Sequence, residues 1–362
     1  MPQRNKSMAG CLLGLAIGDA MGYHVDKLSL EEIIDGYGPN GLLGFDLTHG
    51  GAEVTSYTQL TLFASNALLL AITRNAPEAY SRCLTMAARE WYKSQLFRSA
   101  PDKTRCWVAQ VGCLRRRLCM DTQMLDALSR ETLGTPEKPV FRSLTPGALT
   151  AALGVALCYD PRRMTENQLM RLSVEAVAFT HGKPEVYISA AFLALALARL
   201  LQDPSLSPAE LFTSCLVTIR ARYEGIFPQE LDAFAGLIQQ ALTLTRDPEV
   251  SAQQAMTTLG CATAAECVAG AVYAVTVHPG NFDEGMIASV NHSGRSSAVG
   301  ALTGAFLGAR LGEEGLPEFY LESLECAPYL RELAQDLQDC RQVSRVFDAD
   351  WDQKYIHGLP TG

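Results

Sequence analysis

The sequence predicts an all-α protein, folded as a single compact bundle of many helices. Helix start signals recur along the whole chain, strand signals are few, and no stretch is long or biased enough to act as an interdomain linker. The composition is typical of a well-packed globular chain, because 48% of the 362 residues are hydrophobic and 19% are charged. We therefore expect one domain over residues 1–362.

Several helix starts are marked by residues suited to the first turn. The stretches 29–32 (Ser-Leu-Glu-Glu) and 165–168 (Thr-Glu-Asn-Gln) have the spacing of a capping box, in which two side chains bond reciprocally to backbone N–H groups. Pro77, Pro208 and Pro228 stand at expected first turns, where a proline costs a helix little. The tail from residue 313 to 362 is also expected to be helical. The other predicted helices cover residues 6–21, 29–36, 57–73, 77–95, 146–158, 165–180, 184–202, 208–224, 228–246, 263–277, 281–290 and 296–312.

Glycine recurs at every fourth position in two of these helices, over residues 10–22 and 300–308. Each glycine inside a helix costs up to about 1 kcal/mol relative to alanine, so the repetition needs a physical reason. Residues four apart form a ridge on one helix face, and a ridge without side chains lets another backbone approach closely. We expect these two helices to pack at the centre of the bundle and to bring the ends of the chain together.

Charge and cysteine content exclude some classes of partner. The net charge of −9 argues against a nucleic-acid surface, and the densest basic cluster, Arg115–Arg117, is short enough to be a solvated helix face. The 11 cysteines include no C-x-x-C pair, which is typical of free thiols in a reducing cytoplasm. The apolar stretch 8–23 is too short to span a bilayer and contains Asp19. We expect a cytoplasmic protein with no nucleic-acid or membrane partner.

Polar residues gather beside the two glycine-rich helices. Asp19 lies inside the first helix, Asp26 lies just past its end, and the segment 291–298 (Asn-His-Ser-Gly-Arg-Ser-Ser-Ala) precedes the late one. A helix start rich in Gly and Ser exposes backbone N–H groups that favour anions, and Arg295 adds a positive charge. The pattern predicts a pocket for a phosphate or carboxylate group.

Four segments, in this order, resemble the motifs of the ADP-ribosylglycohydrolases, the family of the dinitrogenase reductase-activating glycohydrolase and the ADP-ribosylhydrolases. They are 10-GCLLGLAIGDAMGYHVD-26, 53-EVTSYTQLTLFASNAL-68, 178-AFTHGKPEVYISAAFLAL-195 and 291-NHSGRSSAVGALTGAFLGA-309, and they span about residues 8–312. The resemblance implies an all-α fold and cleavage of the glycosidic bond from ADP-ribose to a protein side chain, or of related linkages. It also implies two Mg²⁺ ions, held by a T-D-D-T motif early in the chain and a G-D-x-D-T motif late in it. Mg²⁺ prefers such carboxylate and hydroxyl oxygens, and a metal pair can activate water.

The chain departs from the family at the metal motifs. It has Thr-Ser-Tyr-Thr at 55–58 and Gly-Arg-Ser-Ser-Ala at 294–298, so the aspartates of both motifs are replaced. Neutral hydroxyls bind Mg²⁺ poorly, and Arg295 places a cation where a dication is expected. Asp26 stands where some members have a glutamate, and Pro146 and Ala151 replace the Asn and Arg of a further family pattern. We expect no cofactor and no metal ligands.

The first interpretation is a family member without its dimagnesium site, catalytically altered or inactive, with ADP-ribose or a related nucleotide as its expected ligand. Tyr57 would then stack on a base or ribose, or fill the space of the metals. Alternatively, Arg295 forms a structural salt bridge with Asp19, Asp26 or Glu53. The candidate ligand-binding residues are Thr55, Ser56, Tyr57, Thr58, Ser293, Gly294, Arg295, Ser296 and Ser297.

A second interpretation is an active hydrolase that uses carboxylates and no metal, since glycosidic bonds can be cleaved by a paired acid and base. Its candidate catalytic residues are Asp26, Asp19 and Glu53, with histidines as proton shuttles. His181 matches the Thr-His segment of the family and is expected mainly to position a helix. The candidate shuttles are His24, His49 and His292.

A third interpretation is a structural or partner-binding role. Relatives of this fold serve as lens crystallins, so a well-folded protein without catalysis is compatible with the family. The stretch 348–362 alternates acidic and aromatic residues and could dock on another chain, although no feature of the sequence identifies that partner.

Overall fold

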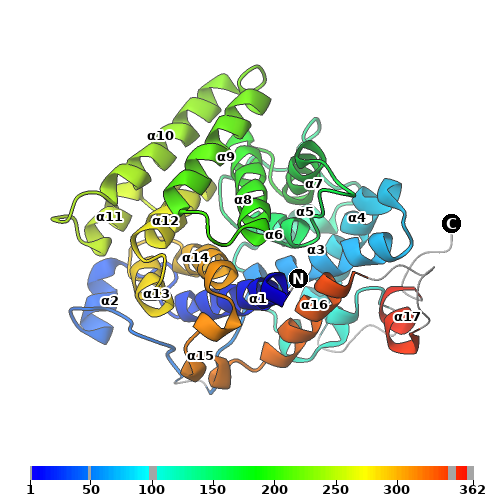
Figure 1. Ribbon diagram of the computed structural model, residues 1–362, viewed down its shortest axis with the longest axis horizontal. Helices are drawn as coiled ribbons and strands as arrows, with labels where there is room; N and C mark the ends of the chain where they lie inside the picture. The colour runs from blue at the N-terminus through cyan, green and yellow to red at the C-terminus, as the bar shows by residue number, and fades with distance from the viewer. Residues whose placement is uncertain (1, 48–49, 98–103, 341–347, 357–362) are drawn as a thin grey trace.

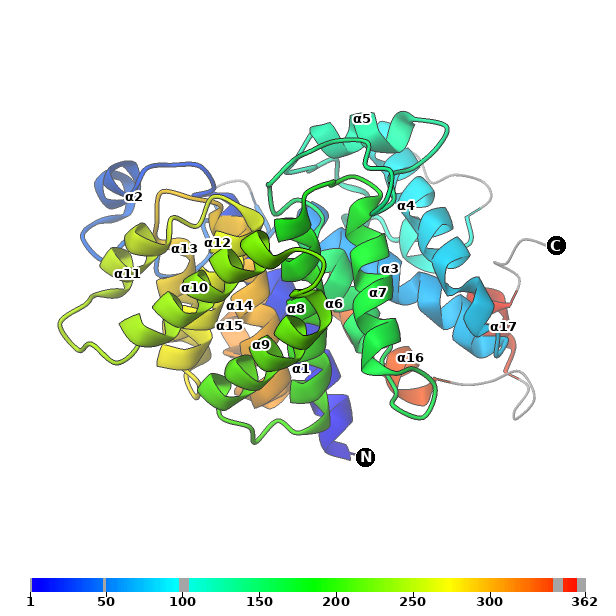
Figure 2. The same ribbon diagram turned by 90° about the horizontal axis from the view of Figure 1, so that it is seen from above.

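The computed structural model describes residues 2–47, 50–97, 104–340 and 348–356, with side chains described from Ser7 onward. Within these residues every regular element is a helix, which confirms the predicted all-α class. Figure 1 shows α1 (Pro2–Tyr23) crossing the middle of the molecule. Figure 2 shows α4 and α17 toward one end, α2 and α11 toward the other, and α7 between α4 and α8. The remaining α-helices are α2 (Leu30–Tyr37), α3 (Ser56–Thr73), α4 (Tyr80–Leu96), α5 (Gln123–Ser129), α6 (Leu149–Leu157), α7 (Glu166–Ala178), α8 (Pro184–Gln202), α9 (Pro208–Tyr223), α10 (Pro228–Leu244), α11 (Ala252–Leu259), α12 (Ala264–Val277), α13 (Phe282–Val290), α14 (Ser296–Leu311), α15 (Glu318–Ser323), α16 (Ala327–Asp339) and α17 (Ala349–Tyr355).

The two glycine ridges face each other, as predicted. Helices α1 and α14 run antiparallel, and a Cβ atom added to Gly14 would overlap the carbonyl oxygen of Gly304, while one added to Gly304 would overlap that of Gly14. The helix backbones therefore touch with no side chain between them, which only glycine permits. The same reciprocal approach relates Gly10 with Gly308 and Gly18 with Gly300.

Helices α3 and α6 form a second close pair beside this centre. All 18 residues of α3 are buried, and hydroxyl groups along its length bond to backbone carbonyls of α6. Thr61 donates to the carbonyl of Thr150 at 2.8 Å, and Ser65 donates to that of Gly154 at 3.2 Å. This pairing fixes where α3 begins, and hence where the polar residues at its start lie.

Helix α8 is the one described helix that is long and apolar enough to cross a membrane, but 83% of its most apolar stretch is buried inside the protein. It contacts α6, α7, α9 and α12. Its apolar length is therefore explained by a central position in a globular bundle.

Twelve predicted helices are present, with ends shifted by a few residues. The predicted helix 77–95 begins with a separate 3₁₀ turn, Pro77–Ala79, before α4. Two further helices were not predicted: α5, whose start has no side-chain cap, and α11, whose start has the capping box of Ser251 and Gln254. Only the second of these carried a signal that the sequence analysis could have used.

The tail packs on its own chain. Trp351 and Tyr355 are buried, and the Tyr355 hydroxyl accepts a hydrogen bond from Trp107 at 2.9 Å and donates one to Asp336 at 2.7 Å. These aromatic side chains were the basis for expecting the tail to dock on another chain. Within residues 348–356 these two rings are buried against their own chain and are not an exposed surface for another one, and docking of the tail stays a prediction. Residues 357–362 lie outside the described residues.

Candidate functional site

A hydrogen-bonded cluster lies where α1, α3 and α14 meet, and Asp19 is at its centre. Its side chain is fully buried. Thr55, the N-cap residue of α3, donates its backbone N–H to Oδ2 at 2.8 Å and its hydroxyl to Oδ1 at 2.7 Å. Thr58 donates its backbone N–H at 3.1 Å and its hydroxyl at 2.7 Å, both to Oδ2. The Ser297 hydroxyl, from the start of α14, lies 2.7 Å from Oδ1.

These contacts use the full acceptor capacity of the Asp19 carboxylate. Burial raises the pKa of Asp19, and the hydrogen bonds from Ser297, Thr58 and Thr55 act against that rise. A carboxylate has about four lone-pair sites, and here it faces five donors from the protein itself. The cluster therefore connects α1, α3 and α14 through hydrogen bonds within the protein.

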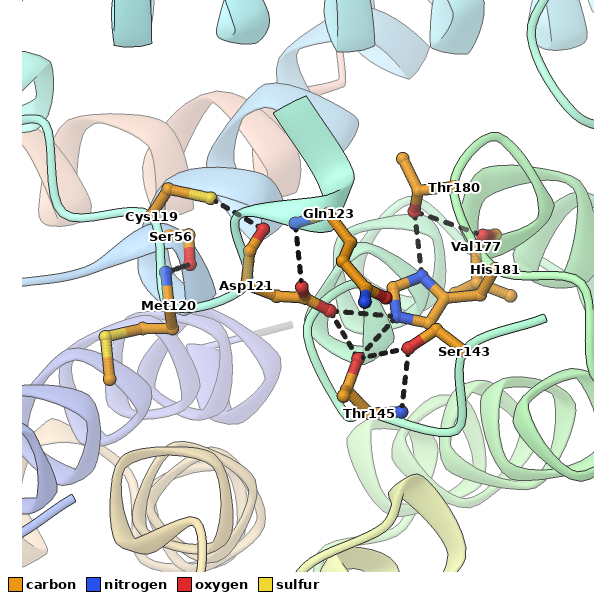
Figure 3. A network of polar contacts seen from close by, with 10 residues as sticks. All are labelled: Ser56, Cys119, Met120, Asp121, Gln123, Ser143, Thr145, Val177, Thr180 and His181. Carbon is orange, nitrogen blue, oxygen red and sulfur yellow. Dashed lines mark hydrogen bonds and ion pairs between the residues drawn. The ribbon is translucent and has the colours of Figure 1, made fainter. Parts of the chain in front are cut away.

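The other two residues at the start of α3 also face inward. The Ser56 hydroxyl accepts a hydrogen bond from the backbone N–H of Met120 at 3.1 Å, as Figure 3 shows. The Tyr57 ring is buried, with 1% of the residue exposed, and burial raises the pKa of its hydroxyl far above the ordinary value. The four hydroxyl side chains at 55–58 are thus arranged around internal contacts.

Arg295 and Asp26 lie at the edge of the cluster. The Arg295 guanidinium is 3.8 Å from Asp26 Oδ2, and the backbone N–H of Ser297 donates to Asp26 Oδ1 at 3.1 Å. The Asp26 side chain is only 3% exposed, and its Oδ2 atom has no hydrogen-bond partner in the described part of the chain. Burial raises the pKa of Asp26 to about 6, although Ser297 and Arg295 favour the ionised form. The salt-bridge alternative for Arg295 is therefore confirmed, with Asp26 as the partner.

The raised pKa predicts a pH-dependent stability that Asp26→Asn should abolish. Between about pH 4 and pH 6 the folded protein keeps a proton on Asp26 that the unfolded chain releases, so the wild type loses stability as pH rises through this range. We expect the free energy of unfolding of the variant, minus that of the wild type, to increase by about 3 kcal/mol from pH 4 to pH 7 and then to level off. Urea unfolding at both pH values measures this difference. A difference that is constant with pH would show that Asp26 ionises normally.

The loop before α14 is tied to the end of α1 and the start of α2. The Ser293 hydroxyl accepts a hydrogen bond from the backbone N–H of Leu30 at 2.7 Å, and the Gly294 carbonyl accepts one from Lys27 at 3.1 Å. The Ser296 hydroxyl donates to the carbonyl of His292 at 3.4 Å. Ser293 is exposed and the side chain of Arg295 is 24% exposed, so these two residues form the solvent-facing part of the cluster.

In the described part of the chain, Glu53 does not take part in the hydrogen bonds of Asp19 and Asp26. Glu53 forms an ion pair with Arg116, whose guanidinium also reaches Glu325. Among the proposed proton shuttles, His24 packs its ring against Tyr23, and His49 lies outside the described residues. Within the described residues, Glu53 therefore pairs with Arg116 and forms no hydrogen bond or ion pair with Asp19 or Asp26.

His292 is closer to the cluster but is enclosed. Its side chain is 1% exposed, and Nε2 lies 3.0 Å from the carbonyl oxygen of Ser289, while Nδ1 has no partner in the described chain. Burial lowers the pKa of His292 to about 4, so the ring is neutral at physiological pH. Nε2 must then carry the proton that the Ser289 carbonyl accepts.

A second polar network, which the sequence analysis did not find, surrounds His181 (Figure 3). His181 Nε2 lies 2.9 Å from the Thr145 hydroxyl and 3.5 Å from Asp121 Oδ2, and Nδ1 lies 2.8 Å from the Thr180 hydroxyl. Burial favours a higher pKa for Asp121, but hydrogen bonds from His181 and Thr145 outweigh it and lower the pKa. Asp121 and Thr145 meet the same ring nitrogen, so they do not form a Ser-His-Asp-type relay, which needs the two groups on opposite nitrogens. The Thr180-His181 pair was the only sequence signal for this network.

Comparison with known proteins decides the family. The family model described as ADP-ribosylglycohydrolase matches residues 1–346. The chain belongs to the ADP-ribosylglycohydrolase family. An uncharacterised protein of Archaeoglobus fulgidus is 25% identical over 338 residues, which cover 91% of this chain and 95% of that protein. A solved structure described as an ADP-ribosylglycohydrolase-related protein complex has a TM-score of 0.57 and 22% identity, covering 94% of this chain and 99% of that one, and it supports the shared fold.

The dimagnesium centre that the ADP-ribosylglycohydrolase family implies does not fit the residues present here. In the described ranges, no three His, Cys, Asp or Glu side chains come together in a way that could hold a metal ion. Asp19, from α1, is the carboxylate that meets the start of α3, and its oxygens already accept hydrogen bonds from Thr55, Thr58 and Ser297. A divalent ion would also meet the positive charge of Arg295 beside Asp26.

Proposed function

We propose that this member of the ADP-ribosylglycohydrolase family has replaced its dimagnesium centre with a metal-free cluster and is catalytically inactive or altered. The observation that carries this proposal is the saturated carboxylate of Asp19, which is buried and accepts from the starts of both α3 and α14. A group whose acceptors are all used by the protein cannot coordinate Mg²⁺ unless those bonds break, at a cost of several kcal/mol. The cluster then serves to join helices where the family places its metals.

ADP-ribose, or a related nucleotide, is the ligand that we propose for the solvent-facing side of the cluster. Arg295 is the cation there, and its guanidinium can bind a phosphate group with two parallel hydrogen bonds. Exposed Ser293 adds a hydroxyl group next to it. On this proposal, Arg295 supplies a positive charge to the diphosphate without a metal ion.

Calorimetric titration of ADP-ribose into metal-stripped protein tests the proposal. We expect micromolar binding that is equal with Mg²⁺ and with EDTA, because Arg295 and not a metal contacts the diphosphate. Arg295→Ala should weaken binding by about tenfold or more, the value of a charge-assisted hydrogen bond. Arg246→Ala, which removes an exposed arginine from the turn after α10, should leave the affinity unchanged.

Each other outcome of this titration contradicts a part of the proposal. Binding that requires Mg²⁺ would show that a metal site persists and that the cluster opens to form it. If no heat of binding is measured with Mg²⁺ or with EDTA, ADP-ribose is excluded as the ligand. The chain would then share the fold of the family but not its ligand.

A metal-independent hydrolase is the second candidate, and Asp26 is the observation that favours it. Its carboxyl has a pKa of about 6 and an oxygen without a hydrogen bond, so it could give or take a proton near neutral pH. Release of ADP-ribose from modified arginine, serine or glutamate peptides in EDTA, lost in Asp26→Asn, would support this activity. No release by the wild type with or without divalent ions would exclude it.

We also propose a cytoplasmic location. None of the 11 cysteines forms a disulfide, and nine of them are buried, as expected for a protein kept in a reducing compartment.

A further inference from the structure

A cavity of about 610 Å³ lies between α4, α7, α8 and α9, away from the Asp19 cluster. It shares no lining residue with that cluster or with the His181 network. Phe179 lines the cavity, whereas the next two residues, Thr180 and His181, turn to the other side and bond toward Thr145. The turn after α7 therefore separates the cavity from the His181 network.

The cavity has the composition of a small-molecule site. Cavities that bind such ligands measure roughly 300–1,000 Å³, with mostly apolar and aromatic walls and a few polar groups. Here four aromatic rings contribute to the walls, and the rings of Tyr223 and Phe227 lie nearly parallel, with an interplanar angle of 18°. A planar ring can pack against such walls in offset-stacked or edge-on arrangements. The four aromatic residues are Phe179, Tyr187, Tyr223 and Phe227.

Tyr187 is the polar group that this wall leaves unsatisfied. The residue is 2% exposed, and its hydroxyl has no hydrogen-bond partner within the described residues. Burial raises the pKa of Tyr187 to about 12, so the hydroxyl keeps its proton. An unpartnered buried hydroxyl costs folding free energy.

The charges on the rim are not equivalent. Arg171 and Glu175 pair with each other along α7, and Ser81 donates a hydrogen bond to Glu175 at 2.6 Å, so these two charges are neutralised. Arg222, at the end of α9, has no ion-pair partner among the described residues and lies over the ring of Tyr223, 5.6 Å from its centroid. Glu137 is the unpaired acid of the described rim and lies on the exposed turn at the other side. An anion is therefore attracted to the α9 side and repelled from the turn.

We propose that this cavity binds a planar aromatic anion, with its ring between Tyr187, Tyr223 and Phe227 and its anionic group at Arg222. The inference stands apart from the metal-free cluster, because it depends on none of the residues near Asp19.

Three naphthalene probes of one shape and different charge test this inference on the full chain. They are 2-naphthoate, 2-naphthalenemethanol and 2-naphthylmethylammonium, with binding measured by ligand-observed NMR titration. We expect 2-naphthoate to bind most tightly and the ammonium probe most weakly. Arg222→Leu should weaken 2-naphthoate about three- to fivefold, as expected for one exposed charge contact, and should leave the neutral probe unchanged. Arg246→Leu, a matched exposed arginine outside the cavity, should change neither.

A second variant tests the position of the site. Ile226 lines the cavity mouth and is 51% exposed, so Ile226→Asp should fold normally and repel an anion. We expect it to weaken 2-naphthoate by a larger factor than 2-naphthalenemethanol. The inference is overturned if the three probes bind equally, if neither Arg222→Leu nor Ile226→Asp changes the affinity for 2-naphthoate, or if no probe binds at millimolar concentration.

Discussion

Gly304→Ala is expected to destabilise the protein by about 3 kcal/mol, although it adds one methyl group and improves helix propensity. A Cβ atom on Gly304 would overlap the carbonyl oxygen of Gly14 in α1, and both partners are helix backbone that cannot turn aside. The two helices would have to separate along the whole ridge. Urea unfolding followed by circular dichroism would measure the loss.

Gly236→Ala is the matched control for this result. Gly236 also lies inside a helix, α10, but a Cβ atom there would meet nothing within 4 Å. The substitution should therefore stabilise the protein, by up to about 1 kcal/mol, through helix propensity alone. If both alanine variants are stabilised, α1 and α14 are not in backbone contact and the glycine ridge has another cause.

Asp19→Ala is expected to cost about 4 kcal/mol, the second large effect. The substitution removes the acceptor for five hydrogen bonds at once and leaves the backbone N–H groups of Thr55 and Thr58 buried without partners. Asp19→Asn should cost much less, because the amide oxygen can still accept from those two N–H groups. The hydroxyls of Thr55 and Ser297 can turn to accept from the new NH₂ group.

The relative free energies of unfolding of the two Asp19 variants test whether the role of Asp19 is structural. If Asp19 acts mainly as a joint between helices, the free energy of unfolding falls strongly for Ala and weakly for Asn. Asp232→Ala provides a surface control, since its ion pair with Arg220 is exposed and should contribute less than about 1 kcal/mol. If both Asp19 variants have the same midpoint of urea unfolding as the wild type, the cluster does not hold α1, α3 and α14 together.

The central packing of the fold could be predicted because its cause is periodic. Glycines at every fourth position identify a helix face without side chains, and two such faces in one chain have an evident use in packing against each other. Helix α5 could not be found in this way, because it has seven residues and no side-chain cap. Short helices depend on tertiary contacts more than on their own signals.

The candidate site was predictable in its location but less so in its contacts. Asp19, Asp26 and the start of α14 do converge, since the antiparallel glycine helices bring the end of one to the start of the other. The partner of Glu53 could not be predicted, because Arg116 comes from an irregular segment with no periodic pattern. For the same reason the sequence did not connect His181 with Asp121, which follows that segment.

The pairing of α1 with α14 has a consequence for synthesis on the ribosome. Helix α1 ends at Tyr23, but its partner begins at Ser296, so nearly the whole chain must be made before the first helix can be covered. At roughly 5–20 residues per second this interval lasts tens of seconds, during which an apolar, glycine-rich helix lacks its partner backbone. Helix α1 is therefore the segment that a chaperone has most reason to protect during synthesis.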